Sequence, residues 1–297
     1  MKAFEYLAPG SLEEALSLLA SHRGNAKILA GGTDLAVQMK YGRTQPAVLV
    51  DVKKVPELNR LESDCEKGLF IGAAVPVTRL VSFPAVLSDY ALLYEACSLI
   101  GSFQLRSRAT IGGNICNAAP SADSAPVLLC LEARAIAAKT GGVRTIPLRD
   151  FFVGPGKTQL SPEELLVGIE IPAPPKTSSG AYLRHIPRQD MDIAVVGVSC
   201  FLVFDPAGGR CLGARIALGA VAPTPMRAAA AESVLGGRSL TKEIIDEAAQ
   251  RAAAEAQPIS DVRGSASYRR EIVRVLTRRT LEKAADAGMV GPKERVS

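Results

Sequence analysis

The sequence predicts a globular protein of mixed strands and helices, divided into two domains. With 297 residues, the chain is long enough to build two separate cores. Hydrophobic residues make up 47% of it and charged residues only 22%, a composition that favours extensive burial. From Pro172 to Gly180, the run Pro-Ala-Pro-Pro-Lys-Thr-Ser-Ser-Gly interrupts every regular pattern. We therefore place a domain boundary at this run.

The N-terminal part alternates apolar strands with amphipathic helices. Ser11-Leu-Glu-Glu14 predicts a capping box at the start of a helix. Gly141-Gly142 predicts a two-residue hairpin between neighbouring strands. The expected strands cover 27–30, which should be buried, 47–52, 69–73, 133–139, 143–147 and 165–171. Further helices are expected after Thr78 and over 88–100 and 125–131.

The C-terminal part begins with strands and ends with helices. The expected strands cover 182–188, 193–204 and 211–218, and a turn over 205–209 pairs the last two. The expected helices cover 228–235, 242–255 and 266–287. The residues from Met289 to Ser297 are expected to form a loose tail.

Two stretches combine paired glycines with small polar residues. Gln104 to Asp123 contains Gly112-Gly113, where the backbone can approach a ligand closely and adopt positive φ. Successive N–H groups in such a turn can bind an anion. Ile28-Leu-Ala-Gly-Gly-Thr-Asp-Leu35 ends an apolar run in a second pair, and Thr33 or Asp34 is expected to cap the next helix. Each pair alone also fits an ordinary turn, but together they indicate a ligand with two phosphates between two loops.

The cysteine pattern does not indicate metal binding. The six cysteines stand at 65, 97, 116, 130, 200 and 211, without a Cys-x-x-Cys pair or a histidine at zinc-ligand spacing. We expect reduced, mostly buried thiols and no iron–sulfur cluster within this chain. No apolar signal region opens the sequence and no apolar run is long enough to span a membrane, so a cytoplasmic location is expected.

Composition and motifs also disfavour several activities. Aromatic residues amount to 5% and Trp is absent, which argues against stacking of nucleic-acid bases, and the net charge of +5 fits a phosphate-bearing cofactor. Gly156-Lys-Thr158 is not a phosphate-binding loop, because Phe151 stands where that motif requires Gly. Neither Gly-x-Gly-x-x-Gly nor Gly-x-Ser-x-Gly occurs, and His22 and His185 complete no catalytic triad. Any redox chemistry must then come from a cofactor.

With both glycine stretches in place, the sequence resembles the FAD-binding medium subunits of the molybdenum hydroxylase family. That family includes the flavoproteins of xanthine, carbon monoxide, aldehyde and N-heteroaromatic dehydrogenases and of hydroxybenzoyl-CoA reductase. The resemblance extends from Met1 to about Ala287. The motifs that carry it are Ile28-Leu-Ala-Gly-Gly-Thr-Asp-Leu35, Arg106-Ser-Arg-Ala-Thr-Ile-Gly-Gly-Asn114, Pro120-Ser-Ala-Asp123, Gly154-Pro-Gly-Lys-Thr158 and Asp192-Ile-Ala194.

The resemblance implies an α+β fold. It implies an FAD-binding fold of the vanillyl-alcohol-oxidase (PCMH) type in two subdomains, followed by a smaller C-terminal α+β domain. The implied divisions are an FAD-binding domain over 1–175, with subdomains of about 1–56 and 57–175, a C-terminal domain over 181–287, and a tail over 288–297.

The resemblance also implies a set of cofactor-binding residues, with no catalytic or metal-ligating residue in this chain. The segments 28–35 and 110–114 look like two pyrophosphate loops, and Asp123 looks like the cofactor-binding acid. Arg184 replaces a Lys that contacts the flavin, where a cation would stabilise the reduced, anionic form. The implied residues are Ile28, Leu29, Ala30, Gly31, Gly32, Thr33, Asp34, Leu35, Ile100, Thr110, Ile111, Gly112, Gly113, Asn114, Asp123, Leu166 and Arg184.

As a whole, the resemblance implies an electron-transfer subunit of a heteromeric molybdenum-containing dehydrogenase. Substrate would be oxidised on a large molybdopterin-Mo subunit, and electrons would pass through [2Fe-2S] clusters on a small subunit to FAD in this chain. NAD+ or another acceptor would then receive them. A stand-alone FAD oxidoreductase and a non-catalytic nucleotide-binding assembly protein remain as alternatives.

Two departures from the family patterns bear on the substrate. Thr33-Asp34 replaces the His-Ser that is usual in carbon monoxide dehydrogenases. The four-cysteine insertion of the hydroxybenzoyl-CoA reductase subunit is missing after Asp123. Both departures favour a purine, aldehyde or N-heteroaromatic substrate.

Overall fold

The computed structural model describes residues 2–188, 191–207 and 209–289. The described residues form two compact units, each assembled from separate stretches of chain. Unit 1 comprises Met1–Ala85, Gly101–Ala118 and Glu132–Ala173, and unit 2 comprises Val86–Ile100, Ala119–Leu131 and Pro174–Ser297. The units thus interleave along the sequence, and the division into domains at 1–175 and 181–287 stays a prediction.

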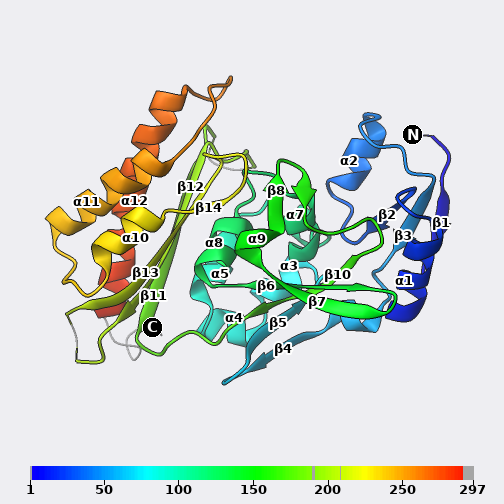
Figure 1. The fold of residues 1–297 in the computed structure, drawn as a ribbon, viewed down its shortest axis with the longest axis horizontal. Helices are drawn as coiled ribbons and strands as arrows, with labels where there is room; N and C mark the ends of the chain where they lie inside the picture. The colour runs from blue at the N-terminus through cyan, green and yellow to red at the C-terminus, as the bar shows by residue number, and fades with distance from the viewer. Residues whose placement is uncertain (1, 189–190, 208, 290–297) are drawn as a thin grey trace. The chain divides into compact units, whose positions relative to one another are not determined.

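Unit 1 begins with a small parallel sheet (Figure 1). Its strand order is β1 (Glu5–Leu7), β3 (Val48–Asp51) and β2 (Ala26–Leu29). Helix α1 (Leu12–Ser21) joins β1 to β2, and α2 (Leu35–Lys40) lies between β2 and β3. The central strand is buried along its whole length, as parallel strands generally are. The strand expected at 27–30 is present as the edge strand β2, but it is only half-buried, so the expectation that it is buried was wrong.

Helix α1 begins at Ser11, as the sequence predicts. The Ser11 hydroxyl oxygen accepts a hydrogen bond from the Glu14 amide N–H at 3.2 Å. The Glu14 carboxylate accepts from the Gly10 N–H at 2.7 Å, one residue before the donor of a complete capping box. The cap is therefore confirmed, with its reciprocal half displaced by one residue.

The second sheet of unit 1 is antiparallel and has five strands. In order they are β4 (Leu61–Asp64), β5 (Gly68–Gly72), β10 (Leu165–Ile171), β6 (Arg134–Lys139) and β7 (Gly142–Pro147). The predicted hairpin between β6 and β7 is confirmed, but its two-residue loop is Thr140-Gly141 and not Gly141-Gly142, since Lys139 pairs with Gly142 and Gly141 has a φ of +91°.

Short elements complete unit 1. They are the 3₁₀ helix Pro56–Asn59, α3 (Val77–Val81), α6 (Phe103–Arg106), α7 (Ile111–Asn117), α9 (Leu148–Phe151), β8 (Phe152–Gly154) and β9 (Lys157–Thr158). Helix α4 (Pro84–Ser88) belongs partly to each unit. The rejected phosphate-loop segment lies in the β8–β9 hairpin, with no helix after it, so that rejection is confirmed.

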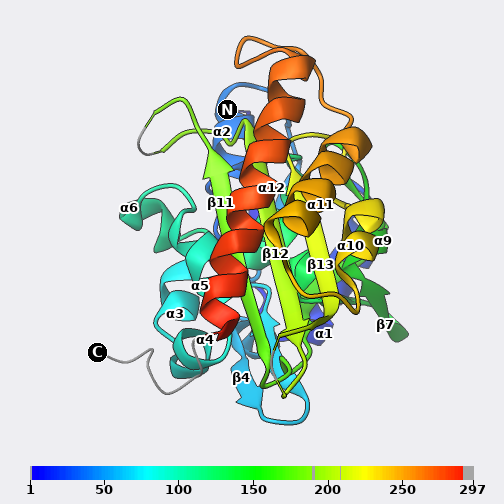
Figure 2. The same cartoon turned by 90° about the vertical axis from the view of Figure 1, so that its left-hand side faces the viewer.

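Unit 2 is built on one antiparallel sheet. Its strands in order are β11 (Ser178–His185), β12 (Val196–Phe204), β13 (Cys211–Gly219) and β14 (Met226–Arg227). Helices α10 (Ala229–Leu235), α11 (Lys242–Glu255) and α12 (Ala266–Met289) cover one face (Figure 2), and α5 (Ala91–Ser98) and α8 (Ser124–Cys130) pack on the other. Because helices lie on both faces, β12 can be apolar and buried at almost every position.

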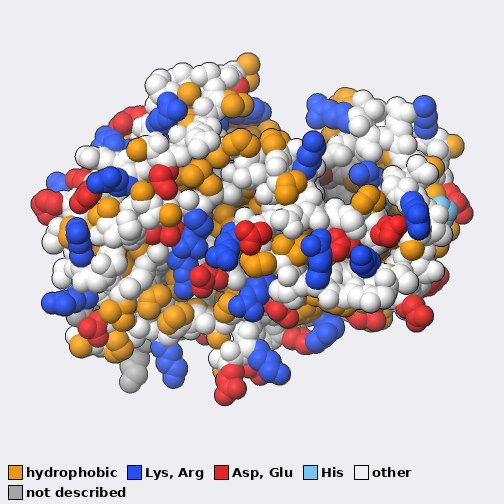
Figure 3. Space-filling model, in the orientation of Figure 1, with side chains coloured by type: hydrophobic (Ala, Val, Ile, Leu, Met, Phe, Trp, Pro, Cys, Tyr) orange, Lys and Arg blue, Asp and Glu red, His pale blue; other side chains and the backbone are white. Residues whose placement is uncertain are grey.

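The C-terminal elements follow the sequence pattern closely. The predicted pairing of the strands on either side of 205–209 is confirmed, although Gly208 lies outside the described residues. Helix α12 continues to Met289, two residues beyond the expected end at 287. The remaining residues of the expected tail, 290–297, lie outside the described part of the chain. On the face in Figure 3, Lys and Arg side chains are interspersed with Asp and Glu, as the modest net charge of +5 suggests.

Candidate functional site

The first glycine stretch turns sharply between β2 and α2. Gly32 has a φ of +75°, in the left-handed region that favours glycine. A β-carbon on Gly31 would collide with the carbonyl oxygen of Arg108 and lie 2.9 Å from the Cα atom of Ala109. Glycine at 31 therefore allows this turn to touch the chain that leads into the second glycine stretch.

The second glycine stretch is a helix start and not a turn. Thr110 is the N-cap of α7, and its hydroxyl oxygen accepts a hydrogen bond from the Gly113 N–H at 2.9 Å. Neither Gly112 nor Gly113 has a positive φ, so that expectation was wrong. The short helix α6 precedes Thr110 in the chain. Gly112 is required for packing instead, because its β-carbon would lie 2.6 Å from the Ala73 carbonyl oxygen.

The structure brings the two glycine stretches together within unit 1. Besides the contact at Gly31, the Gln38 side chain of α2 donates a hydrogen bond to the Asn117 side chain of α7 at 3.0 Å. The backbone N–H groups of Ile111 and Gly112 lie in the first turn of α7, where a helix offers them no carbonyl partner. Two backbone segments that few side chains obstruct thus lie side by side, as a ligand with two phosphates would require.

The residues after Gly32 depart from expectation. Asp34 occupies the N-cap position of α2, but its side chain makes no capping hydrogen bond. The expected cap by Thr33 or Asp34 was therefore wrong. The Asp34 carboxyl is exposed, and the surrounding protein removes enough water from it to raise its pKa. Leu35 begins the helix and is half-buried.

In unit 2, Asp123 stands at the N-cap of α8 with its side chain 11% exposed. Its Oδ2 accepts from Arg184 Nη1 at 2.6 Å, and its Oδ1 accepts from the Tyr182 hydroxyl at 2.7 Å. Burial raises the pKa of Asp123, while Arg184 and Tyr182 oppose that shift by stabilising the carboxylate. Arg184 is thus already paired, and its charge is compensated by Asp123, another predicted residue of this unit.

Helix α8 holds Asp123 in a defined electrostatic setting. All seven of its residues are buried. Asp123 lies at its positive end, and Arg215 Nη1 donates to the Cys130 carbonyl oxygen at 2.8 Å at its negative end. The negative charge of Asp123 and the positive charge of Arg215 thus complement the α8 dipole at its two ends, which stabilises the Asp123 carboxylate.

Tyr182 is the residue of this cluster that the sequence does not reveal. It is 1% exposed and lies on the same face of β11 as Arg184, two positions away. That spacing is the one signal in the sequence that links the two side chains. A single tyrosine two positions from an arginine is too common a pattern to attract attention.

The remaining predicted residues lie in different units. Leu166 is buried in β10 of unit 1, on which α7 packs. Ile100 is half-buried and follows α5 in unit 2. The predicted set therefore divides into the glycine stretches with Leu166 in unit 1, and Ile100, Asp123 and Arg184 in unit 2.

His185 and the six cysteines, which the sequence also draws attention to, lie in ordinary protein environments. His185 Nε2 lies 3.0 Å from the Tyr268 hydroxyl, with the two rings edge to face. All six cysteines are free thiols, four of them buried, as expected.

Within 2–188, 191–207 and 209–289, no cluster of His, Cys, Asp and Glu could hold a metal. None of the helices among these residues has the length and apolar character needed to cross a membrane.

Comparison with known proteins covers nearly the whole chain. Residues 2–174 match the family described as the FAD binding domain in molybdopterin dehydrogenase, and residues 181–284 match the CO dehydrogenase flavoprotein C-terminal domain. The carbon monoxide dehydrogenase medium chain of Hydrogenophaga pseudoflava is 36% identical over 95% of this chain and 96% of its own length. The xanthine dehydrogenase FAD-binding subunit of Escherichia coli O157:H7 is 32% identical over 95% of this chain and 96% of its own length.

A solved structure agrees with these matches. The carbon monoxide dehydrogenase from Hydrogenophaga pseudoflava that lacks the Mo-pyranopterin moiety of its molybdenum cofactor superposes with a TM-score of 0.92 at 37% identity. The superposition covers 97% of this chain and 99% of that one. The predicted fold class, an FAD-binding domain followed by a C-terminal domain, is thereby confirmed. The chain belongs to the FAD-binding medium subunits of the molybdenum hydroxylase family, which are flavoprotein subunits of oxidoreductases.

Proposed function

We propose that this chain carries electrons through FAD within a heteromeric molybdenum-containing dehydrogenase. The observation that supports this most is the contact between the two glycine stretches, at Gly31 and the Arg108–Ala109 backbone. A cofactor with a diphosphate needs closely spaced backbone N–H groups and little side-chain bulk around them. The chain meets that need at two adjacent places.

The residues of unit 1 would hold the diphosphate end of the cofactor. These are Ile28 to Leu35 and Thr110 to Asn114. Ile28, Leu29 and Ala30 are half-buried, which leaves apolar surface that a bound cofactor would cover. Thr110 fixes the first turn of α7 through its hydrogen bond to Gly113, so the backbone N–H groups there are oriented before a ligand binds.

Ile100, Leu166, Asp123 and Arg184 would contact the flavin end. FAD, when bound, supplies the capacity to accept and release electrons. Asp123 and Arg184 supply a buried ion pair at 2.6 Å, in which the guanidinium presents its positive charge next to a compensating carboxylate. Arg184 would favour the reduced, anionic flavin, and Asp123 would limit that effect.

The partners belong to this proposal as well. Electrons would arrive from a small subunit with [2Fe-2S] clusters, after oxidation of substrate on a large subunit with molybdopterin-Mo. NAD+ or another acceptor would receive them, in the cytoplasm. The division into an FAD-binding domain over 1–175, a C-terminal domain over 181–287 and a tail over 288–297 is part of the same proposal.

A purine, aldehyde or N-heteroaromatic substrate remains our proposal for the complex. Relatives whose names refer to carbon monoxide and to xanthine are 36% and 32% identical to this chain, too close together to separate substrate classes. Thr33-Asp34 and the direct continuation from Asp123 to Ser124 favour the proposed classes. Identification of the chains that co-purify with this one would test the choice.

The proposal is tested with the purified chain and two matched glycine variants. The wild type is expected to bind FAD, with visible flavin absorption. Gly31→Ala should weaken FAD binding by at least about tenfold because it drives the two stretches apart. Gly154→Ala adds a β-carbon that meets nothing within 4 Å in the same unit, so it should bind FAD like the wild type.

The same preparation separates the alternatives. A colourless protein that does not bind added FAD would refute both flavin functions and favour a nucleotide-binding assembly protein. Co-purification of molybdenum and iron with the flavin supports the dehydrogenase complex. A flavoprotein that oxidises substrate without partners would instead be a stand-alone oxidoreductase.

A further inference from the structure

The Asp123 carboxylate has a different donor on each of its oxygens. Tyr182 donates to Oδ1 at 2.7 Å and Arg184 to Oδ2 at 2.6 Å. The side chains of Arg184 and Asp123 are only 7% and 11% exposed, so water offers little competition. Rotation of the carboxylate would break a hydrogen bond to a charged group in a poorly solvated place. The two donors together therefore fix the orientation of Asp123.

The Tyr182 hydroxyl lies against Gly197 of the neighbouring strand. A β-carbon on Gly197 of β12 would lie 2.8 Å from the Tyr182 hydroxyl oxygen and 3.5 Å from two of its ring carbons. Glycine at 197 thus leaves the space that the hydroxyl occupies. Burial and the nearby Asp123 charge raise the pKa of Tyr182, so the hydroxyl keeps its proton and remains a donor.

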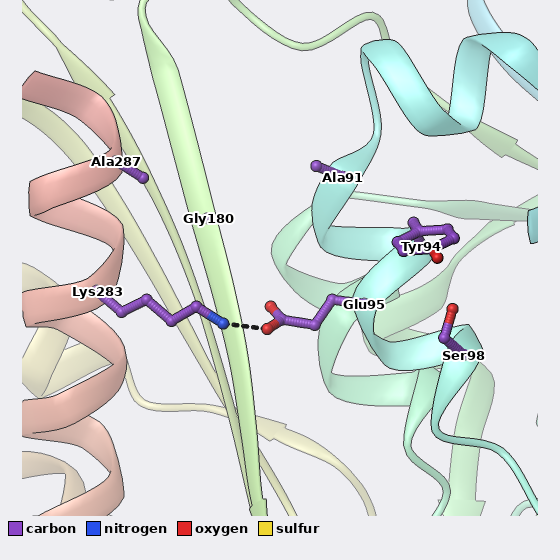
Figure 4. A pocket seen from close by; sticks show the side chains of 7 residues that line it. All are labelled: Ala91, Tyr94, Glu95, Ser98, Gly180, Lys283 and Ala287. Carbon is purple, nitrogen blue, oxygen red and sulfur yellow. Dashed lines mark hydrogen bonds and ion pairs between the residues drawn. The ribbon is translucent and has the colours of Figure 1, made fainter. Parts of the chain in front are cut away.

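The Tyr182 backbone is held from a different direction. Its N–H donates to Glu95 Oε2 of α5 at 2.9 Å. Glu95 also forms an ion pair with Lys283 of α12, which reaches across β11 at Gly180 (Figure 4). This pair lies in a groove of about 630 Å³ that Tyr94 and Ser98 also line. Both the backbone and the hydroxyl of Tyr182 therefore have fixed partners.

We propose that Tyr182 is a positioning residue of the cofactor site, which holds Asp123 against Arg184 so that FAD meets a rigid, neutral ion pair. This inference rests on the proposed function. Tyr182 acts through Asp123 and need not touch FAD. Glu95 supports it by fixing the β11 backbone at this position.

The first test compares two buried tyrosines in the FAD-binding chain. Tyr182→Phe removes the donor to Asp123, whereas Tyr90→Phe removes a hydroxyl from another tyrosine that is 3% exposed. Tyr182→Phe should weaken FAD binding about tenfold, as loss of a hydrogen bond to a charged group predicts. Tyr90→Phe should stay within about twofold of the wild type.

A second readout separates positioning from a general loss of stability. At pH 8, an Asp123 carboxylate without its tyrosine donor carries a less compensated negative charge. Tyr182→Phe should therefore shift the ratio of affinities for oxidised and reduced FAD towards the oxidised form, by about threefold. A purely structural role would weaken both affinities equally. Thermal unfolding without FAD checks that each variant is folded.

Gly197→Ala provides an independent route to the same displacement. Its β-carbon would push the hydroxyl of Tyr182 away from Asp123, so it should weaken FAD binding about as much as Tyr182→Phe does. Combined with Tyr182→Phe it should add little, because phenylalanine lacks the oxygen that collides. Gly213→Ala, whose β-carbon meets nothing within 4 Å on the neighbouring strand, is the matched control.

The outcomes distinguish the two proposals. A wild-type chain that does not bind FAD overturns the proposed function. A wild type that binds FAD while Tyr182→Phe and Tyr90→Phe behave alike in both readouts overturns the positioning role alone. Equal and additive effects of Gly197→Ala in the presence and absence of the Tyr182 hydroxyl would also overturn it. If Tyr182→Phe were unfolded, a Gly197→Ala chain that binds FAD as tightly as Gly213→Ala would overturn the positioning role.

Discussion

Arg144 and Glu164 form a two-point ion pair in unit 1, with distances of 2.6 Å between Nε and Oε1 and 2.8 Å between Nη2 and Oε2. The Glu164 side chain is 5% exposed, whereas that of Arg144 is 46% exposed. Arg144 lowers the pKa of the Glu164 carboxyl, and the Ser161 N–H reinforces this effect against burial. The pair fastens the loop before β10 to strand β7.

This pair should make the stability of the protein depend on pH in the acid range. Because the folded pKa of Glu164 is lowered, its contribution is fully present above the ordinary value of 4.5 and is lost as pH falls through the folded value. Arg144→Met should lower the unfolding free energy at pH 7 and flatten its decrease towards pH 3. Urea unfolding measures both, and parallel pH curves for the two proteins would contradict the prediction. The exposed Arg149→Met serves as control.

Adjacent glycines of α7 should respond differently to alanine. Gly112→Ala places a β-carbon 2.6 Å from the Ala73 carbonyl oxygen, which should cost about 2 kcal/mol despite the better helix propensity of alanine. Gly113→Ala meets only the Thr110 hydroxyl, at 3.1 Å, and should change stability by less than about 1 kcal/mol. Urea unfolding compares them, and equal stabilities would show that α7 does not pack on Ala73.

One thiol should react quickly in the folded protein. Cys65 is exposed, whereas burial raises the pKa of Cys116 and Cys130 to about 12 and suppresses their reactive thiolates. A thiol reagent should label one cysteine rapidly in buffer and all six in denaturant. Cys65→Ser should abolish the rapid phase, and Cys116→Ser should leave it intact. A second rapid thiol in the native protein would contradict this assignment.

The buried Arg269 should be a main determinant of stability in unit 2. It is 3% exposed and donates to the Val195 carbonyl oxygen at 2.8 Å and to Asp261 Oδ1 at 2.7 Å. Arg269→Ala removes the donor to the buried Val195 carbonyl oxygen and the ion pair with Asp261, and should lower stability by about 3 kcal/mol. Arg274→Ala, at a side chain that is 39% exposed, should have a much smaller effect. A denaturation midpoint for Arg269→Ala equal to that of Arg274→Ala would refute the prediction.

Long elements with a clear period are predictable from this sequence. The expected helix over 242–255 and the expected strand over 165–171 coincide with α11 and β10. Short strands are not predictable in this way. Three-residue β1 has no measurable period, and it exists because its backbone pairs with β3, more than forty positions away.

The glycine stretches show where local signals stop being sufficient. The sequence indicates that Gly112-Gly113 matters, but glycine disfavours helices, and the pair therefore looks like a turn. The helix forms because Thr110 caps it and because Gly112 fits against Ala73, a non-local contact. Likewise, the link from Asp123 to Tyr182 spans 59 positions, and no period in the sequence records it.

Because the two units interleave along the sequence, the chain cannot be divided into two independent folding units by a single cut. Helix α8, from the N-terminal half, is enclosed by the sheet formed after Pro174. In a polypeptide ending at Ala173, the seven apolar and small residues of α8 would lose the sheet that buries them. The exposed apolar surface would promote aggregation. Neither half of the sequence contains all of one unit, so a chain divided at the proline-rich run would give two fragments that cannot fold independently.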